Sequence, residues 1–499
     1  MTSARRLTAI LLLAGTGALP AAVPALAQGA AAQPARLVAR AVDVIGGAEA
    51  LRRLAVTTME FNSASFGLGQ EETPESPPRA TLSWGRITTD WHGARRAVEQ
   101  ESRAVTGAVT RARQVVAGGR GMNETGASQA AMAPAAVAGV LRGIELQPHR
   151  MLLTALDNPS RLRPLRPRTF RGEVMDGVRL ADGADTVSLW FDRPSGLLVV
   201  SEIVADDDIT GDRQTLTWYT RWQPVEGAAG VRLPRQVDTE VTGRLLSHNV
   251  VTSYRMDTAV DPGLFAIPDS IAGRTAPVTG PVPAPPVVVT LVELAPGVWR
   301  AEGGTHFSLV VEQGSRLVVV ELPQSRARGT AVLDTLRARF PGRTVATVVN
   351  THHHHDHAGG IRVALARGLP VATHARNAAF IRSIGTARKT ARPDALSRAP
   401  RAPVVRPVSD TLVLGTGDHR VVLLPVPSVH AEGILAAYLP GSRLLFVADV
   451  LTPGPVLNPV GSAELVALVR ARNLVVDRVV GAHGGIAPWA DVERAAARQ

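Results

Sequence analysis

A run of histidines interrupted by one aspartate lies in the second half of the chain, in the segment THHHHDHAGG at 351–360. Five of the chain's 13 histidines fall within positions 352–357. Imidazole and carboxylate groups are ligands that suit zinc, and manganese or iron are alternatives. The run follows an apolar, strand-like segment and precedes a helix-like one, which is unlike a histidine tag at a chain end. The pattern therefore predicts a metal site.

Only one register of the run fits the spacing His-x-His-x-Asp-His, namely His352, His354, Asp356 and His357. Alternate side chains of an extended loop face the same way, so His352 and His354 can converge on one metal ion. Asp356 and His357 then turn toward a second ion. The other two histidines of the run are intervening residues.

Four residues cannot complete two metal sites, and the sequence offers three more residues of ligand type downstream: His430, Asp449 and His483. His430 lies in a turn between two apolar segments, Asp449 follows the segment 444–448, and His483 follows the segment 475–480. Folds that bind metals and substrates place such residues on loops and at strand ends. We therefore expect these three residues to join the histidine run.

The elements around these residues alternate between strand-like and helix-like patterns. The expected strands are 287–294, 306–311, 316–322 and 344–350, and the expected helices are 330–339 and 360–367. This alternation is typical of a layered α/β domain.

Residues 287–490 resemble the metallo-β-lactamase-fold superfamily of metal-dependent hydrolases, through the motif THHHHDHAGG and the three downstream residues. The resemblance implies a four-layer αββα sandwich that holds two Zn²⁺ ions. It implies that the first ion is bound by His352, His354 and His430, and the second by Asp356, His357 and His483. Asp449 would bridge the two ions.

The bridging Asp449 makes the chain more similar to hydroxyacylglutathione hydrolases and lactonases than to true zinc β-lactamases, which lack it. The motif and the domain order are most like those of exported bacterial members of the superfamily. The chain departs from many relatives at Glu321, where they carry an aspartate behind the site. We expect Glu321, His306 and His374 to orient the ligand imidazoles from behind.

The predicted chemistry is hydrolysis. Two metal ions lower the pKa of a bridging water, so that hydroxide can attack the carbonyl of an ester, lactone, thioester or amide. Asp356 would bind metal and orient this nucleophile. β-Lactamase, phosphodiesterase or alkylsulfatase activity on the same site is an alternative, and a periplasmic lipid- or metal-binding protein is a non-enzymatic one. We expect a small-molecule substrate, whose identity the sequence leaves open along with the oligomeric state.

Residues 37–270 form the predicted first domain, and 271–286, with five prolines, a stiff linker. Alternating segments separated by turns, such as the hairpin 187–200, predict a mainly antiparallel β domain. Their pattern, with the ending DPGLFAIP at 261–268, resembles the β half-barrels of periplasmic lipoprotein-carrier domains. That resemblance implies a concave apolar face that could bind an acyl chain or support the second domain.

Residues 1–27 predict a secretory signal peptide, because two arginines precede the apolar run 7–13 and the segment ALA at 25–27. The apolar run is too short to span a bilayer. No other stretch is long and apolar enough for a transmembrane helix. We expect a periplasmic or secreted protein, exported by the general or the twin-arginine route.

The formal net charge is +11, but the charge does not predict nucleic-acid binding. The basic residues are scattered, only 4% of residues are aromatic, and Lys389 is the only lysine. We expect the basic stretch 376–406 and the acidic turn 206–208 to be solvated. The absence of cysteine excludes disulfides, thiolate catalysis and cysteine-bound zinc.

Overall fold

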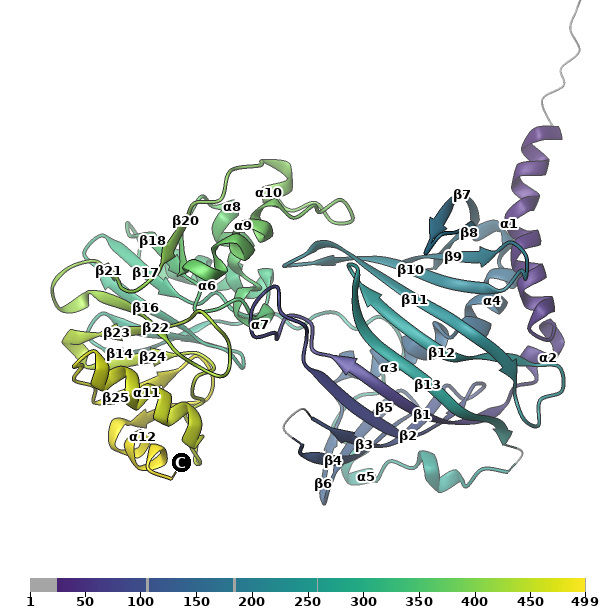
Figure 1. Ribbon diagram of the computed structural model, residues 1–499, viewed down its shortest axis with the longest axis horizontal. Helices are drawn as coiled ribbons and strands as arrows, with labels where there is room; N and C mark the ends of the chain where they lie inside the picture. The colour runs from purple at the N-terminus through teal and green to yellow at the C-terminus, as the bar shows by residue number, and fades with distance from the viewer. Residues whose placement is uncertain (1–24, 105–106, 183–184, 258, 499) are drawn as a thin grey trace, which may run out of the picture.

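The computed structural model describes residues 25–104, 107–182, 185–257 and 259–498, arranged as two β-rich domains (Figure 1). Residues 1–24 of the predicted signal peptide lie outside the described part of the chain. In the described part, no helix has both the length and the hydropathy needed to cross a membrane.

The first domain is built on one antiparallel sheet of 13 strands in the order β6-β5-β4-β3-β2-β1-β13-β12-β11-β10-β9-β8-β7. The strands are β1 (Val56–Phe66), β2 (Ala80–Asp90), β3 (Arg95–Arg103), β4 (Val109–Ala117), β5 (Arg120–Thr125), β6 (Ser128–Ala131), β7 (Leu162–Phe170), β8 (Glu173–Asp182), β9 (Asp185–Asp192), β10 (Leu198–Asp207), β11 (Gly211–Pro224), β12 (Arg232–Val241) and β13 (Arg244–Asp257). Neighbours in the sheet are neighbours in sequence except at β1 and β13, where Val56 pairs with Asp257. The predicted mainly antiparallel β character is confirmed.

Helices cover the apolar face of this sheet: α1 (Ala25–Val44), α2 (Ala48–Arg52), α3 (Pro134–Glu145) and α4 (Pro148–Asp157). Val38 of α1 and Leu152 of α4 are fully buried in one cluster with Leu189 of the sheet. Burying a side chain of this size stabilises a fold by about 1.5–3 kcal/mol. The chain's own helices therefore occupy the apolar face that the carrier resemblance implied to be concave and available.

The first half of the predicted linker 271–286 packs against the first domain. The short helix α5 (Asp269–Ala272) buries Ile271 against the sheet, and the amide of Val278 donates a 2.7 Å hydrogen bond to the carbonyl of Gly119. Its first half thus packs along the first domain before the chain enters the second.

The second domain contains two sheets. The first has the strands β14 (Thr290–Ala295), β15 (Val298–Glu302), β16 (Ser308–Gln313), β17 (Arg316–Val320), β18 (Thr344–Val349), β19 (Val371–His374) and β20 (Val405–Val408). The second has the strands β21 (Leu412–Leu414), β22 (Val421–Val426), β23 (Ile434–Leu439), β24 (Leu444–Val447), β25 (Arg478–Gly481) and β26 (Ile486–Pro488). Strands β17 to β20 run parallel to one another, as do β24 and β25.

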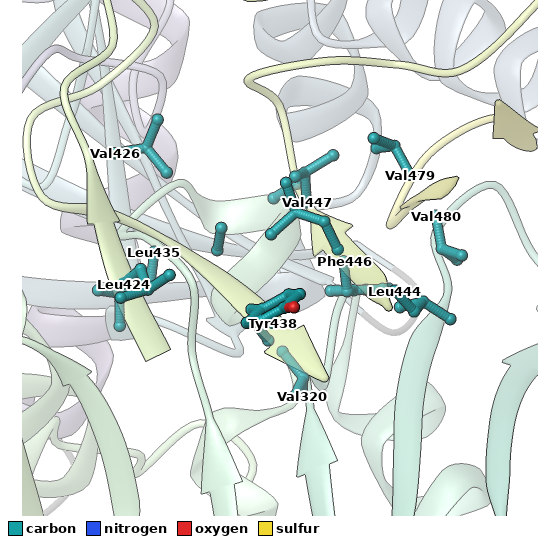
Figure 2. Packing of buried hydrophobic residues seen from close by; sticks show 14 of the residues in the cluster. Val320, Leu424, Val426, Leu435, Tyr438, Leu444, Phe446, Val447, Val479 and Val480 are labelled. Carbon is teal, nitrogen blue, oxygen red and sulfur yellow. The ribbon is translucent and has the colours of Figure 1, made fainter. Parts of the chain in front are cut away.

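The two sheets face each other across an apolar core that includes Val320, Tyr438 and Phe446 (Figure 2). The helices α6 (Arg326–Arg339), α8 (Ile361–Ala366) and α9 (Ala378–Thr386) pack on the outer face of the first sheet, and α11 (Pro459–Ala471) and α12 (Trp489–Ala496) pack on the second. The predicted α/β class with a four-layer αββα sandwich in the second domain is confirmed.

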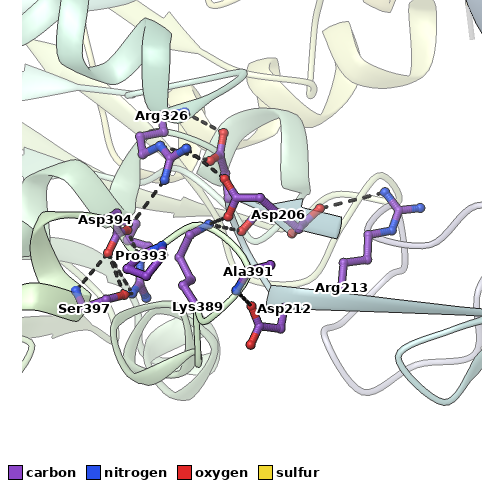
Figure 3. Close-up of polar contacts among 12 residues, drawn as sticks. Asp206, Asp212, Arg213, Arg326, Lys389, Ala391, Pro393, Asp394 and Ser397 are labelled. Carbon is purple, nitrogen blue, oxygen red and sulfur yellow. Dashed lines mark hydrogen bonds and ion pairs between the residues drawn. The ribbon is translucent and has the colours of Figure 1, made fainter. Parts of the chain in front are cut away.

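A charged contact joins the two domains at the turn between β10 and β11 (Figure 3). Asp206 forms ion pairs with Lys389 and, at 2.9 Å, with Arg326, whose amide donates to Asp208 at 2.8 Å. The ammonium group of Lys389 also donates to the Asp207 carbonyl at 2.6 Å, and the Lys389 side chain is fully buried. The expectation of a solvated acidic turn beside a solvated basic loop is therefore wrong here, because the two segments neutralise each other between the domains.

Candidate metal centre

The candidate ligands lie at one edge of the sandwich, where several parallel strands end. The histidine run begins at His352, three residues after the end of β18, and its second part forms the short helix α7 (His355–Ala358). Asp449 and His483 each come two residues after a strand end, β24 and β25 respectively, and His430 lies in the turn between β22 and β23. The carboxyl ends of parallel strands meet at one edge of a sheet, which is where α/β folds bind ligands.

One cluster consists of His352, His354, His430 and Asp449, with one ligand-type atom of each lying within 4.8 Å of the others. His430 Nε2 is 3.0 Å from His354 Nδ1 and 3.2 Å from Asp449 Oδ2. The three histidines are those that the family resemblance implies for the first metal ion.

A second cluster consists of His306, Asp356, His357 and His483, again within 4.8 Å of one another. His357 Nε2 is 3.1 Å from His483 Nε2. Asp449 Oδ1 lies 3.0 Å from His357 Nε2 and 2.9 Å from His483 Nε2. Asp449 thus directs one carboxylate oxygen toward each cluster, as a bridging ligand must.

The chemistry of these groups fits two cations. His352 Nε2 is buried and has no hydrogen-bond partner among the described residues. Burying a polar atom without a partner is costly unless a ligand satisfies it. Each cluster also brings two imidazole nitrogens, both of which can bind metal, to about hydrogen-bonding distance. They are those of His354 and His430 at 3.0 Å and those of His357 and His483 at 3.1 Å. His352, His354 and His430 can hold one metal ion, and Asp356, His357 and His483 the other, with Asp449 between them.

Two histidines of the first cluster, His352 and His354, are held in the neutral form that binds metal. Burial lowers the pKa of His354, and of the intervening His353, to about 4, and it lowers the pKa of His352 well below its ordinary value. All three are therefore neutral at pH 7, and a neutral imidazole can bind a metal ion without first losing a proton.

The carboxylates of Asp356 and Asp449 are held in their charged form at the second cluster. Burial opposes the charge of Asp449, but hydrogen bonds from His357, His430 and His483 hold its pKa far below the usual range. The pKa of Asp356 is likewise lowered against burial, by His306, His357 and Gln70. Burial would lower the pKa of His357, yet Glu321 and Asp449 outweigh it and raise that pKa to about 10. These carboxylates create a place that favours positive charge.

Glu321, one of the predicted supporting residues, contacts His357 directly. Its fully buried carboxylate accepts hydrogen bonds from the amide of Thr351 at 2.8 Å and from His357 Nδ1 at 2.9 Å. The second bond leaves His357 Nε2 turned toward Asp449 and His483. The Thr351 hydroxyl lies 3.0 Å from His352 Nδ1, which similarly leaves His352 Nε2 for the cluster.

The other two predicted supporting residues differ from expectation. His306 lies within the second cluster, with Nε2 3.1 Å from Asp356 Oδ2 and its ring centroid 3.9 Å from that of His483. His306 is therefore close enough to Asp356, His357 and His483 to bind a metal ion together with them, whereas the prediction gave it only a supporting role. His374 ends strand β19, and its Nδ1 accepts from the Arg376 amide at 3.2 Å. No hydrogen bond or ion pair among the described residues links His374 to either cluster, because its ring caps the following turn.

Sequence reasoning missed two residues of the first domain, Gln70 and Glu71, in the loop between β1 and β2. Gln70 Nε2 donates to Asp356 Oδ1 at 2.7 Å. The Glu71 carbonyl accepts from Nε2 of His353 at 3.0 Å and of His354 at 2.8 Å. No motif marks these residues, since one of them acts through its backbone.

Comparison with known proteins identifies the class of the second domain. Residues 301–483 match the family model of the metallo-beta-lactamase superfamily, and this part of the chain is a metallo-β-lactamase superfamily domain. A hydroxyacylglutathione hydrolase of Gloeobacter violaceus is 31% identical over 143 residues, covering 27% of this chain and 49% of that protein. The 2,4-dinitroanisole O-demethylase subunit alpha of a Nocardioides species is 27% identical over 162 residues, covering 32% and 46%.

This chain thus spans about half the length of the curated relatives that it matches. Among solved structures, a metallo-beta-lactamase from Pontibacter korlensis is 17% identical, with a TM-score of 0.33, and the match covers 41% of this chain and 96% of that one.

Proposed function

We propose that this protein is a dinuclear metal-dependent hydrolase that cleaves an ester, lactone, thioester or amide of a small molecule. Zinc is the proposed metal, because imidazole nitrogens dominate the donor set. We also propose that the protein acts in the periplasm or outside the cell, on the strength of the predicted signal peptide at 1–27.

The position of Asp449 carries the proposal. Its two carboxylate oxygens face two different sets of histidines, at 3.2 Å from His430 on one side and 2.9 Å from His483 on the other. A protein that only stores one ion has no need for two such sets sharing one carboxylate. Two adjacent metal ions are suited to hydrolysis.

When bound, two metal ions would lower the pKa of water and polarise the oxygen of the bond to be cleaved. The protein's own groups would set the geometry. Asp356 is fixed between Gln70 on one oxygen and His306 on the other, so its carboxylate has one orientation toward the cluster. Glu321 fixes the ring of His357 in the same way. Such fixed dipoles need no rearrangement during the reaction.

One of the two curated relatives supports an acyl substrate, whereas the other is named an O-demethylase. The name of the Gloeobacter relative states that it hydrolyses an acyl compound, and that relative matches this chain over 143 residues. β-Lactams, phosphodiesters and alkyl sulfates remain useful members of a substrate panel.

The alternative of a lipid carrier has less support from the first domain. Helices cover the apolar face of its sheet, and a cavity of about 740 Å³ over β1–β4 is lined by charged pairs. In this cavity Arg86 pairs with Glu99 at 2.6 Å and Arg111 with Glu101 at 2.8 Å. Binding sites for apolar ligands are lined mainly by apolar side chains.

The test is a hydrolysis assay with the purified, zinc-loaded full-length protein. Esters, lactones, thioesters and amides are offered beside β-lactams, phosphodiesters and alkyl sulfates, each with and without EDTA. We expect EDTA-sensitive turnover of an acyl compound. Asp449→Ala should lower it by more than about 100-fold, because losing a group that only orients a ligand already costs 10- to 100-fold.

Asp334→Ala is the matched control, since Asp334 lies on α6 and its exposed carboxylate pairs only with Arg367 among the described residues. It should retain wild-type turnover. If the wild-type protein binds no metal, or turns over nothing in an EDTA-sensitive manner, the proposed function is wrong.

A further inference from the structure

The loop between β1 and β2, residues 67–79, reaches from the first domain to the metal centre of the second (Figure 1). The amide of His355 donates to the Gly69 carbonyl at 3.1 Å, and the amide of Glu432 donates to the Glu72 carbonyl at 2.9 Å. At its far end, Arg79 donates to the carbonyl of His430 at 3.1 Å. The loop therefore contacts both segments that carry the histidines of the first cluster.

The Glu71 carbonyl determines which nitrogen of His354 is free. A carbonyl oxygen can only accept, so Nε2 of His354, at 2.8 Å, must carry the hydrogen. In a neutral imidazole this leaves Nδ1 with a lone pair, and Nδ1 is the atom that faces His430 Nε2 at 3.0 Å. A residue 283 positions away in sequence thus sets the tautomer of a candidate metal ligand.

The loop also holds one side of Asp356. Gln70 Nε2 donates to Oδ1 at 2.7 Å, whereas Oδ2 receives His306 of the second domain at 3.1 Å. The two hydrogen bonds fix both oxygens of this carboxylate. Without Gln70, Oδ1 would lose this hydrogen bond, and the contact with His306 would hold the carboxylate on one side alone.

The loop conformation is built for this contact. Gly69 has φ +81°, and a Cβ atom placed on it would lie 2.4 Å from Cγ of the His355 ring. Only glycine permits both the conformation and the close approach. The Glu71 side chain is almost fully buried and forms a 2.7 Å ion pair with Arg244 of β13, which ties the loop to its own sheet.

We propose that the β1–β2 loop is an integral part of the metal centre, in which Glu71 and Gln70 are positioning residues. The Glu71 carbonyl orients His354, and the Gln70 amide orients Asp356, so the first domain sets the metal affinity of the second. This inference rests on the proposed function only in that the clusters bind metal.

The experiment compares zinc affinity and the absorption spectrum of the cobalt-loaded protein among full-length variants. Gly69→Ala would push the loop away from His355 and should weaken zinc binding by about 10- to 100-fold, the range for groups that orient metal ligands. Gln70→Met keeps the side-chain length and removes the donor. It should weaken zinc binding by about tenfold and alter the d–d bands of cobalt, since Asp356 would change its orientation.

Gly243→Ala is the control, because Gly243 has a similar φ of +78° in another turn of the same sheet but no atom within 4 Å of a Cβ placed there. It should match the wild type in both readouts. Circular dichroism and melting of the metal-free proteins report whether Gly69→Ala still folds, and Gln70→Met tests the proposal without introducing a clash.

The outcomes separate the two proposals. If the wild type binds zinc and both loop variants match it in affinity and cobalt spectrum, the loop proposal is overturned, and the proposed function is decided by the hydrolysis assay. If the wild type binds no zinc or cobalt, both are overturned.

Discussion

Replacing Glu321 by glutamine removes one charge from behind the second cluster with almost no change in shape. The carboxylate accepts two hydrogen bonds, from the Thr351 amide at 2.8 Å and from His357 Nδ1 at 2.9 Å. A glutamine has a single acceptor oxygen, and its amide nitrogen donates. One of the two donors must then face another donor, in a place where Glu321 is fully buried.

The size of the effect follows from this loss. A hydrogen bond to a charged group contributes about 1.5–3 kcal/mol, and every 1.4 kcal/mol is tenfold in affinity. We therefore expect Glu321→Gln to weaken metal binding at the His357 cluster by about 10- to 100-fold. The cluster of His352, His354 and His430 does not contact Glu321 directly, so its metal should be held with an affinity close to that of the wild type.

The assay is a zinc titration against a chromophoric chelator, which resolves a tight and a weakened site. Glu202→Gln is the control, because Glu202 is also a buried glutamate whose carboxylate accepts hydrogen bonds on both oxygens, but in the sheet of the first domain. Its donors are Arg168, Trp190 and Gln214. It should lower stability and leave both zinc affinities unchanged. Wild-type affinity of Glu321→Gln for both ions, or equal weakening of both sites, would contradict this prediction.

Three further predictions concern stability. EDTA should lower the melting temperature of the wild type, because it removes bound metal, and a ligand present at 100 times its Kd stabilises the folded state by about 2.7 kcal/mol. A melting temperature that EDTA leaves unchanged in calorimetry would contradict the presence of bound metal. Burial lowers the pKa of His149 to about 3. In the unfolded chain this histidine takes up a proton near pH 6.5, whereas in the folded chain it stays neutral until about pH 3. The free energy of unfolding should therefore fall by up to about 1.4 kcal/mol per pH unit as the pH drops from 6.5 toward 3. His149→Phe, which keeps an aromatic ring against Trp91, should flatten that slope in urea titrations at pH 7 and 5; an equal slope would refute the assignment. Lys389→Met should lower the free energy of unfolding, measured in urea, by about 3 kcal/mol. This is the low end of the range for breaking a buried ion pair, because Arg326 still pairs with Asp206. A change below about 0.5 kcal/mol would exclude a structural role for Lys389.

The positions of the candidate ligands could be predicted from sequence because each follows a strand or lies in a turn. Spacing within the run separated His352 and His354 from the intervening histidines, and the downstream residues were marked by the apolar segments before them. His306 was noticed, but its distance to Asp356 depends on how a turn folds back across the edge of the sheet. No sequence pattern specifies that distance.

The contacts between domains could not be predicted, for a physical reason. Asp206 and Lys389 have the charges of solvated loops, and only the docked domains show that they neutralise each other. Glu71 contributes a backbone carbonyl, a group that every residue possesses. A local pattern carries no information about a partner that lies far along the chain and on another domain.

The placement of β1 in the middle of the first sheet has a consequence for the order of folding. On either side of it, successive hairpins can form from local contacts, β1 through β6 in one half and β7 through β13 in the other. Among the described strands, only the ladder between β1 and β13, which begins with Val56 paired with Asp257, pairs the two halves, and it requires closure of a long loop. The hairpin that carries Gln70 and Glu71 begins at this seam. Uptake of metal at full affinity should therefore be a late event in biogenesis, after the seam has closed and the domains have docked.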